Sequence, residues 1–189
     1  MFTRRLVLVF ASGLLVPLTA QSAPPPVAVT ARLYNTARVP AEVSDAALAI
    51  ATQAMGAGIR VSWQKCDLPD TCTLVPAREE LIIRLVRSRD TASYVLGEAS
   101  IDTSASAGVL ATIYVDRVER MAALSETDAT VLLGRAIAHE LGHLLMATNA
   151  HNAAGLMRAQ WTTADLRRNQ MNDWMLREED AAAIRRRLK

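Results

Sequence analysis

The chain contains the stretch His139-Glu140-Leu141-Gly142-His143, which is followed by His151 and then by Gly155-Leu156-Met157. On a helix, two histidines four residues apart project from one face, so both imidazoles can reach one zinc ion at about 2.0–2.1 Å. Glu140 then projects beside the metal. The chain has three histidines in all, and they cluster in one short segment, as a three-ligand site requires. The sequence therefore predicts zinc (Zn²⁺) bound by His139, His143 and His151.

Three neutral imidazoles leave one coordination position for water, which is typical of a catalytic rather than a structural zinc site. Zinc lowers the pKa of such a water to about 7, and Glu140 is placed to take its proton during attack on a carbonyl. The metal would also polarise the substrate carbonyl, so peptide hydrolysis is the predicted reaction. A structural site has no need of this carboxylate. The alternative is an exported zinc-binding structural or interaction protein, or an inactive relic of an enzyme.

Residues 1–22 have the layout of an export signal. The basic start Thr3-Arg4-Arg5 precedes an apolar run from Leu6 to Leu18 and the small-x-small cleavage site Ala20-Gln21-Ser22. The run contains a glycine and a proline and falls short of the ~20 apolar residues that span a bilayer. We predict a secreted or periplasmic protein without a stable membrane anchor after signal removal. The general secretory route is favoured over the twin-arginine route.

The remaining residues, 23–189, are enough for one domain with a proper core and too few for two. Removing the signal takes away two arginines and no acidic residue, which leaves 19 basic and 19 acidic residues. The mature chain is formally neutral, so no overall basic field attracts nucleic acid or anionic lipid. We expect a peptide or protein substrate as partner and no nucleic acid. The sequence does not reveal the oligomeric state.

Cys66 and Cys72 are the only cysteines in the chain. In an exported protein an even number of cysteines favours a disulfide, which here would close the loop 67–71. A free thiol is the alternative, because Lys65-Cys66-Asp67-Leu68-Pro69-Asp70 faintly resembles the cysteine switch of matrix metalloproteinase pro-segments, where a thiolate occupies the zinc. The stretch lacks that motif's glycine and lies inside the domain, so the disulfide is preferred.

The pattern of apolar residues predicts an α+β domain with a mixed sheet. Strands are expected at 27–34, 59–64, 81–87, 95–99 and 109–116. Helices are expected at 40–54, at 125–146, near Asp165 and from Glu178-Glu179-Asp180 to the terminal arginines. The small residues of 102–108 predict a loop.

The helix that carries the zinc motif has a recognisable start. Ser125-Glu126-Thr127-Asp128 matches a capping box, in which Ser125 and Asp128 exchange hydrogen bonds with each other's backbone. The helix is expected to end near Met146. Gly134 and Gly142 cost about 1 kcal/mol each in helix propensity, which close packing against the sheet would explain.

Together these features resemble the metzincin clan of zinc metallopeptidases. The likeness lies in H-E-x-x-H, a nearby third histidine, a following methionine and the order of elements. It implies a zincin fold, with a mixed sheet, a zinc-binding active-site helix, a Met-turn and a C-terminal helix. It also implies an endopeptidase in which Glu140 is the catalytic base and Met157 forms a hydrophobic floor under the metal. An extended substrate would pair with an edge strand, for which 109–115 is the candidate.

The spacing departs from the clan at one point. The clan has a glycine three residues after the second histidine and the third histidine three residues later, but Met146 and Asn149 occupy these positions. The fourteen residues from His143 to Met157 match matrix-metalloproteinase-like members. Without the glycine, the helix is free to continue toward Asn149, and a later turn needs a later ligand. His151 is therefore preferred over Asn149, whose amide oxygen suits harder cations.

A thermolysin-like site is a further alternative. Its downstream glutamate ligand would be Glu178 or Glu179. Both residues fit better as the acidic start of the C-terminal helix.

Overall fold

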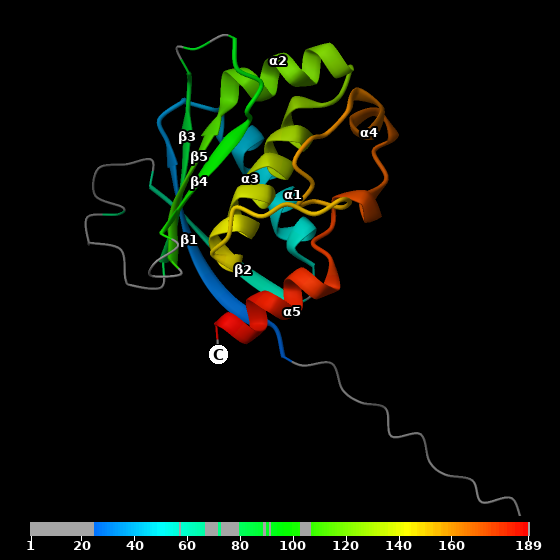
Figure 1. The fold of residues 1–189 in the computed structure, drawn as a ribbon. Helices are drawn as coiled ribbons and strands as arrows, with labels where there is room; N and C mark the ends of the chain where they lie inside the picture. The colour runs from blue at the N-terminus through cyan, green and yellow to red at the C-terminus, as the bar shows by residue number, and fades with distance from the viewer. Residues whose placement is uncertain are drawn as a thin grey trace, which may run out of the picture.

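Figure 1 shows the fold in a computed structural model, which describes residues 25–56, 58–66, 72, 80–88, 90, 92–102 and 107–188. The expected export signal at residues 1–22 lies outside this range. Within the described residues, no helix combines the length and the hydrophobicity needed to cross a bilayer.

One mixed sheet of five strands forms the first layer of the fold, in the order β2-β1-β3-β5-β4. Its strands are β1 (Val27–Asn35), β2 (Ile59–Lys65), β3 (Glu80–Val86), β4 (Gly97–Asp102) and β5 (Ala107–Tyr114). Four strands run parallel, and β4 alone is antiparallel to its neighbour β5. The expected strands at 27–34, 59–64 and 81–87 are confirmed to within one residue at each end.

The helices form the second layer, on one side of the sheet (Figure 1). They are α1 (Ala41–Met55), α2 (Val115–Ser125), α3 (Ala129–Met146), α4 (Thr163–Arg168), the 3₁₀ helix η1 (Met171–Trp174) and α5 (Glu178–Arg187). The expected helix at 40–54 is confirmed as α1, and the acidic start of the C-terminal helix is confirmed at Glu178. The predicted α+β architecture with a mixed sheet is therefore correct.

The core lies between the sheet and α3. Alternate residues of the central strands, among them Leu33, Ile83 and Ile113, are fully buried, as expected for a sheet covered on this face. Helix α3 is buried from Leu132 to Leu145 without interruption. A helix enclosed on all sides is held in place by its neighbours, so side chains on it have little freedom to move.

The two glycines of α3 do not pack against the sheet, which corrects our expectation. A Cβ atom on Gly134 would lie 2.6 Å from the carbonyl oxygen of Ala47 and 2.7 Å from Cβ of Ile50, both on α1. Gly134 therefore lets α1 and α3 approach closely. Gly142 faces Met157 instead, as described below.

Helix α2 was absent from the expected order of elements. The prediction of a strand over 109–116 is wrong at its end, because β5 stops at Tyr114 and Val115 begins α2. Ser125 is the last residue of α2, and its hydroxyl donates to the carbonyl of Met121 at 2.7 Å. The predicted capping box is wrong for this reason. Asp128 caps α3 alone, and its Oδ1 accepts the N–H groups of the second and third residues of the helix at 2.7 and 3.1 Å.

The edge strand beside α3 also differs from the prediction. Strand β5 lies between β3 and β4, so the segment 109–115 is interior. Strand β4 forms the edge of the sheet, and one of its sides has no partner strand among the described residues. A strand edge of this kind can pair with an extended peptide.

Candidate metal centre

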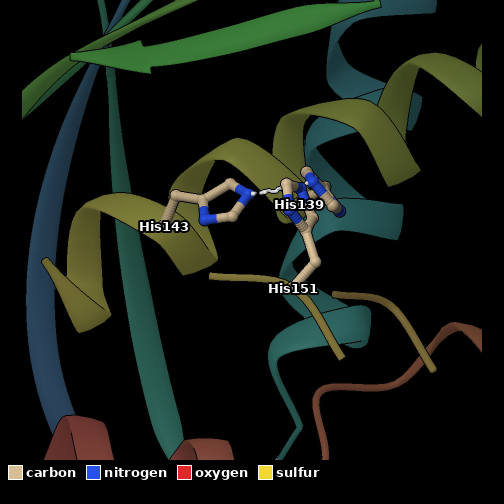
Figure 2. A group of neighbouring side chains, drawn as sticks. All are labelled: His139, His143 and His151. Carbon is tan, nitrogen blue, oxygen red and sulfur yellow. Dashed lines mark hydrogen bonds between the residues drawn. The ribbon is translucent and has the colours of Figure 1, made fainter. Parts of the chain in front are cut away.

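Three histidines converge beside the sheet edge. His139 and His143 lie one turn apart on α3, and His151 comes from the segment that follows this helix (Figure 2). The Nε2 atom of His143 lies 3.0 Å from Nε2 of His139 and 3.2 Å from Nε2 of His151. Nitrogens bound to a tetrahedral zinc ion at about 2.0–2.1 Å are separated by about 3.3 Å. The predicted ligand set therefore has nearly the spacing that one metal ion needs.

The hydrogen bonds of His139 and His143 fix their tautomers. Nδ1 of His139 donates to the carbonyl of Leu156 at 2.8 Å, and Nδ1 of His143 donates to the carbonyl of Thr148 at 2.7 Å. A carbonyl oxygen accepts only, so each Nδ1 carries the proton. Both Nε2 atoms consequently present lone pairs to the same point. Partners of this kind commonly orient metal-binding histidines.

Two lone pairs facing each other at 3.0 Å repel unless a cation lies between them. A proton is a poor candidate for this role. Burial lowers the pKa of His139 to about 4, although its hydrogen bond to Leu156 opposes the shift. Burial also lowers the pKa of His143. The donor set therefore fits a metal ion that prefers imidazole nitrogen, and zinc is such an ion.

Glu140 lies next to the histidines on α3 and is buried. Gly97 of β4 packs against its side chain and leaves no room for a methyl group. Burial raises the pKa of Glu140 to about 8, and the negative charge of Glu98 adds to this effect. A divalent cation at the histidines would favour the ionised carboxylate and shift the pKa in the opposite direction.

Met157 lies beneath α3, where a Met-turn was expected. It is 1% exposed, and a Cβ atom on Gly142 would lie only 2.5 Å from its Sδ. The chain reaches this position through Gly155, whose φ of 78° favours glycine. The carbonyl of Met157 accepts the N–H of Asn152 at 2.8 Å, which closes the segment on itself. The turn and the helix glycine thus form one packed unit.

The expected end of α3 near Met146 is confirmed, but the expected continuation toward Asn149 is wrong. The helix stops at Met146, and Ala147 rather than Asn149 adopts the left-handed conformation, with φ 51° and ψ 45°. The turn falls one residue after the position of the clan glycine, which explains why the third histidine also comes later. His151 reaches the other two histidines, whereas Asn149 lines the neighbouring cavity.

The remaining candidates lie elsewhere. Cys66 and Cys72 form a disulfide, which confirms the predicted bridge and contradicts a free thiol on the metal. Glu178 forms an ion pair with Arg185, so it is not turned toward the histidines as a thermolysin-like ligand. Glu179 is paired with Arg177 at 2.5 Å.

Aromatic residues that sequence reasoning missed support His139 from the side. The ring of Trp161 meets that of His139 edge to face, with centroids 5.5 Å apart, and Trp174 packs on Trp161 at 5.1 Å. The guanidinium of Arg135 lies 3.9 Å from the centre of the Trp174 ring, a cation–π contact. Only the apolar character of the tryptophans was visible in the sequence, since their spacing from the motif carries no signal.

A cavity of about 710 Å³ opens beside the histidines. It lies between β4 with the residues before it on one side and the segment 158–161 on the other. Its lining includes the three histidines and Glu140, together with apolar residues that extend away from them. Those apolar residues include Val95, Leu96, Met121, Ala136, Trp161 and Leu166. A cavity with a few polar groups in an apolar lining is typical of a ligand site.

Neither a protein-family model nor a curated protein matches the sequence. Among solved structures, archaemetzincin from Methanopyrus kandleri is similar, with a TM-score of 0.50 and 16% sequence identity. The match covers 92% of this chain and 99% of that one. At this identity the likeness concerns the fold, while the closer resemblance to matrix metalloproteinases stays a prediction. The chain has a metzincin-like fold, which it shares with archaemetzincin.

Proposed function

We propose that the chain is an exported zinc-dependent endopeptidase. One observation carries the proposal: two buried imidazole lone pairs face each other at 3.0 Å, and a buried carboxylate follows the first of them on the same helix. The facing lone pairs need a cation, and the adjacent carboxylate suits a proton-transfer role. The fold shared with archaemetzincin supports this proposal.

His139, His143 and His151 would hold the ion. Bound zinc supplies Lewis acidity, which polarises a substrate carbonyl and makes water a better nucleophile near neutral pH. Glu140 takes the proton of the attacking water and passes it to the amine that leaves. Gly97 and the body of α3 keep this carboxylate in one place, so the proton acceptor is oriented before substrate arrives.

The substrate would lie extended along β4. The side of this strand that has no partner strand among the described residues offers backbone groups to a peptide, and the cavity next to it accepts side chains. The apolar lining favours polypeptides with large apolar residues near the cleaved bond. The disulfide between Cys66 and Cys72 supports export to an oxidising compartment, in agreement with the expected signal at residues 1–22.

The test compares the zinc-loaded wild type with Glu140→Ala on a broad library of peptides. We expect both to hold one zinc ion and the variant to lose about 10²–10⁴ in rate, because the general base is missing. Glu179→Ala is the matched control, since this glutamate is exposed on α5 and should leave both cleavage and zinc content unchanged. Equal inertness of wild type and Glu140→Ala, with zinc retained, would favour the exported zinc-binding module instead.

A further inference from the structure

Two large apolar residues are exposed at the mouth of the cavity. Tyr94 is 66% exposed and Val95 is 54% exposed, and both line the cavity that contains His139 and Glu140. They are adjacent in sequence and immediately precede the region of β4. Exposed apolar pairs next to a ligand cavity commonly contact the ligand. We call Tyr94 and Val95 the rim.

Two arginines of α2 hold the main chain of the rim. Nη1 of Arg117 donates to the carbonyl of Val95 at 2.9 Å, and its Nη2 donates to Oγ of Ser88 at 2.9 Å. Nη2 of Arg120 donates to the carbonyl of Ser93 at 2.5 Å. Both arginines bind carbonyl oxygens of the loop, and the guanidinium of Arg120 also lies 5.8 Å from the centre of the Tyr94 ring.

Arg117 is itself firmly placed. It is 7% exposed, and its guanidinium lies 4.0 Å from the ring centre of Tyr114 at the end of β5. The N–H of Tyr114 donates to the carbonyl of Leu96 at 2.9 Å, which ties the loop to the sheet on the other side of Val95. The rim therefore stands at a fixed distance from the sheet and α2.

We infer that the rim selects the substrate by binding a large apolar side chain of an extended peptide. Met121 and Leu166 line the same cavity as the rim and add to its apolar surface. Arg117 and Arg120 act as positioning residues, because they fix the rim and lie behind it. The inference rests on the proposed peptidase function and names the feature of the substrate that the cavity recognises.

The experiment uses peptide pairs that differ at one residue, leucine or serine, scanned along the positions around the cleaved bond. At the position that meets the rim, wild type should prefer leucine. Tyr94→Ser combined with Val95→Ser should raise KM for the leucine peptide roughly tenfold or more. The loss of apolar contact with the leucine side chain changes the preference for leucine over serine by about this factor. KM for the serine peptide, kcat and zinc content should stay unchanged. Leu124→Ser is the control, because Leu124 is 62% exposed on α2 and does not line the cavity.

The positioning residues have their own variants. Arg120→Met should raise KM for the leucine peptide at constant kcat, because the carbonyl of Ser93 loses its donor and the rim loosens. Arg117→Lys is the second variant, and it keeps the positive charge while losing the paired contacts with Val95 and Ser88. Unchanged KM in both folded variants would show that neither arginine positions the rim.

Binding measurements separate the rim from the proposed chemistry. The same peptides are titrated into Glu140→Ala and into Glu140→Ala carrying the two serine substitutions, with fluorescence anisotropy as the readout. A leucine preference that disappears with the rim supports the inference even if wild type cleaves nothing. The same affinities in both proteins, including no detectable binding by either, would contradict the proposed role of the rim in substrate selection. This holds whether or not wild type is a peptidase.

Discussion

Gly97 on the edge strand and Glu140 on α3 approach so closely that a Cβ atom on Gly97 would lie 2.7 Å from Cγ and 2.9 Å from Oε1 of the glutamate. Both distances are below van der Waals contact. The buried carboxylate has little space to retreat, since the surrounding helix is enclosed. Because Gly97 has no side chain, the carboxylate of Glu140 can lie against β4 at this position.

Gly97→Ala should therefore displace Glu140 and lower kcat about 10- to 100-fold, because small misplacements of a catalytic group have effects of this size. Zinc content should stay at that of the wild type. Gly108→Ala is the matched control: its added methyl would meet Ile101 Cδ1 at 2.6 Å and Leu144 Cα at 3.0 Å, and not the carboxylate. It should lower the melting temperature without a selective loss of kcat. Steady-state kinetics and thermal unfolding of both variants would decide, and equal kcat in the two would contradict this role of Gly97.

Gly142→Ala should weaken zinc binding about 10- to 100-fold, an effect typical of changes in the groups that support metal ligands. The new methyl overlaps Sδ of Met157, whose turn also carries the Leu156 carbonyl that holds His139. Competitive zinc titration measures the change. Gly134→Ala, which would meet α1 instead, should destabilise the fold but leave zinc affinity nearly unchanged. If Gly134→Ala and Gly142→Ala affect zinc equally, the turn beneath the helix has no special part in metal binding.

His151→Ala should lower zinc affinity by more than about 100-fold, because one of three imidazole ligands is lost. Asn149→Ala should have a much smaller effect, since Ala147 and not Asn149 terminates α3 and the amide only lines the cavity. Metal stoichiometry and competitive titration on both variants provide the measurement. Loss of zinc from Asn149→Ala with retention by His151→Ala would reverse the assignment of the third ligand.

Zinc binding at pH 7 should release a proton from Glu140. Burial raises its pKa to about 8 in the metal-free protein, so about nine tenths of the molecules carry this proton at pH 7. A bound cation favours the carboxylate, and binding therefore expels the proton. The release attributable to Glu140 should decline above pH 8, where the group is already ionised. Calorimetry in buffers of different ionisation enthalpy measures it, with Glu140→Gln as the reference. Equal proton release by both proteins across this range would contradict the raised pKa.

The histidine pair on α3 and the central strands could be predicted from the sequence because their signals are local. The spacing of His139 and His143 on one helix face is a property of the helix alone. The alternation of apolar residues in β1, β2 and β3 likewise reflects burial of one face of each strand. In both cases the residue types and their spacing along the chain are enough to predict the element and the face on which its side chains lie, without knowledge of tertiary contacts.

Helix α2 and the identity of the edge strand could not be predicted in the same way. Val115 follows a strand directly, so the β-branched run concealed the start of the helix, and Ser125 resembled a cap although it ends α2. The place of β4 at the edge depends on the order of strands in space, which local patterns do not encode. The contact of Gly97 with Glu140 follows from that order and was invisible for the same reason.

The two acceptors that fix the histidine tautomers are main-chain carbonyls, at Thr148 and Leu156. Replacing either side chain leaves the carbonyl in place, so point substitutions at these positions do not remove the acceptor directly. A carboxylate partner, by contrast, could be deleted by a single change. Mutational robustness of the tautomer is thus built into the path of the backbone. Position 148 tolerates changes of side chain on this ground, whereas Leu156 is fully buried, so only a replacement that fills the same space in the core keeps its carbonyl directed at His139.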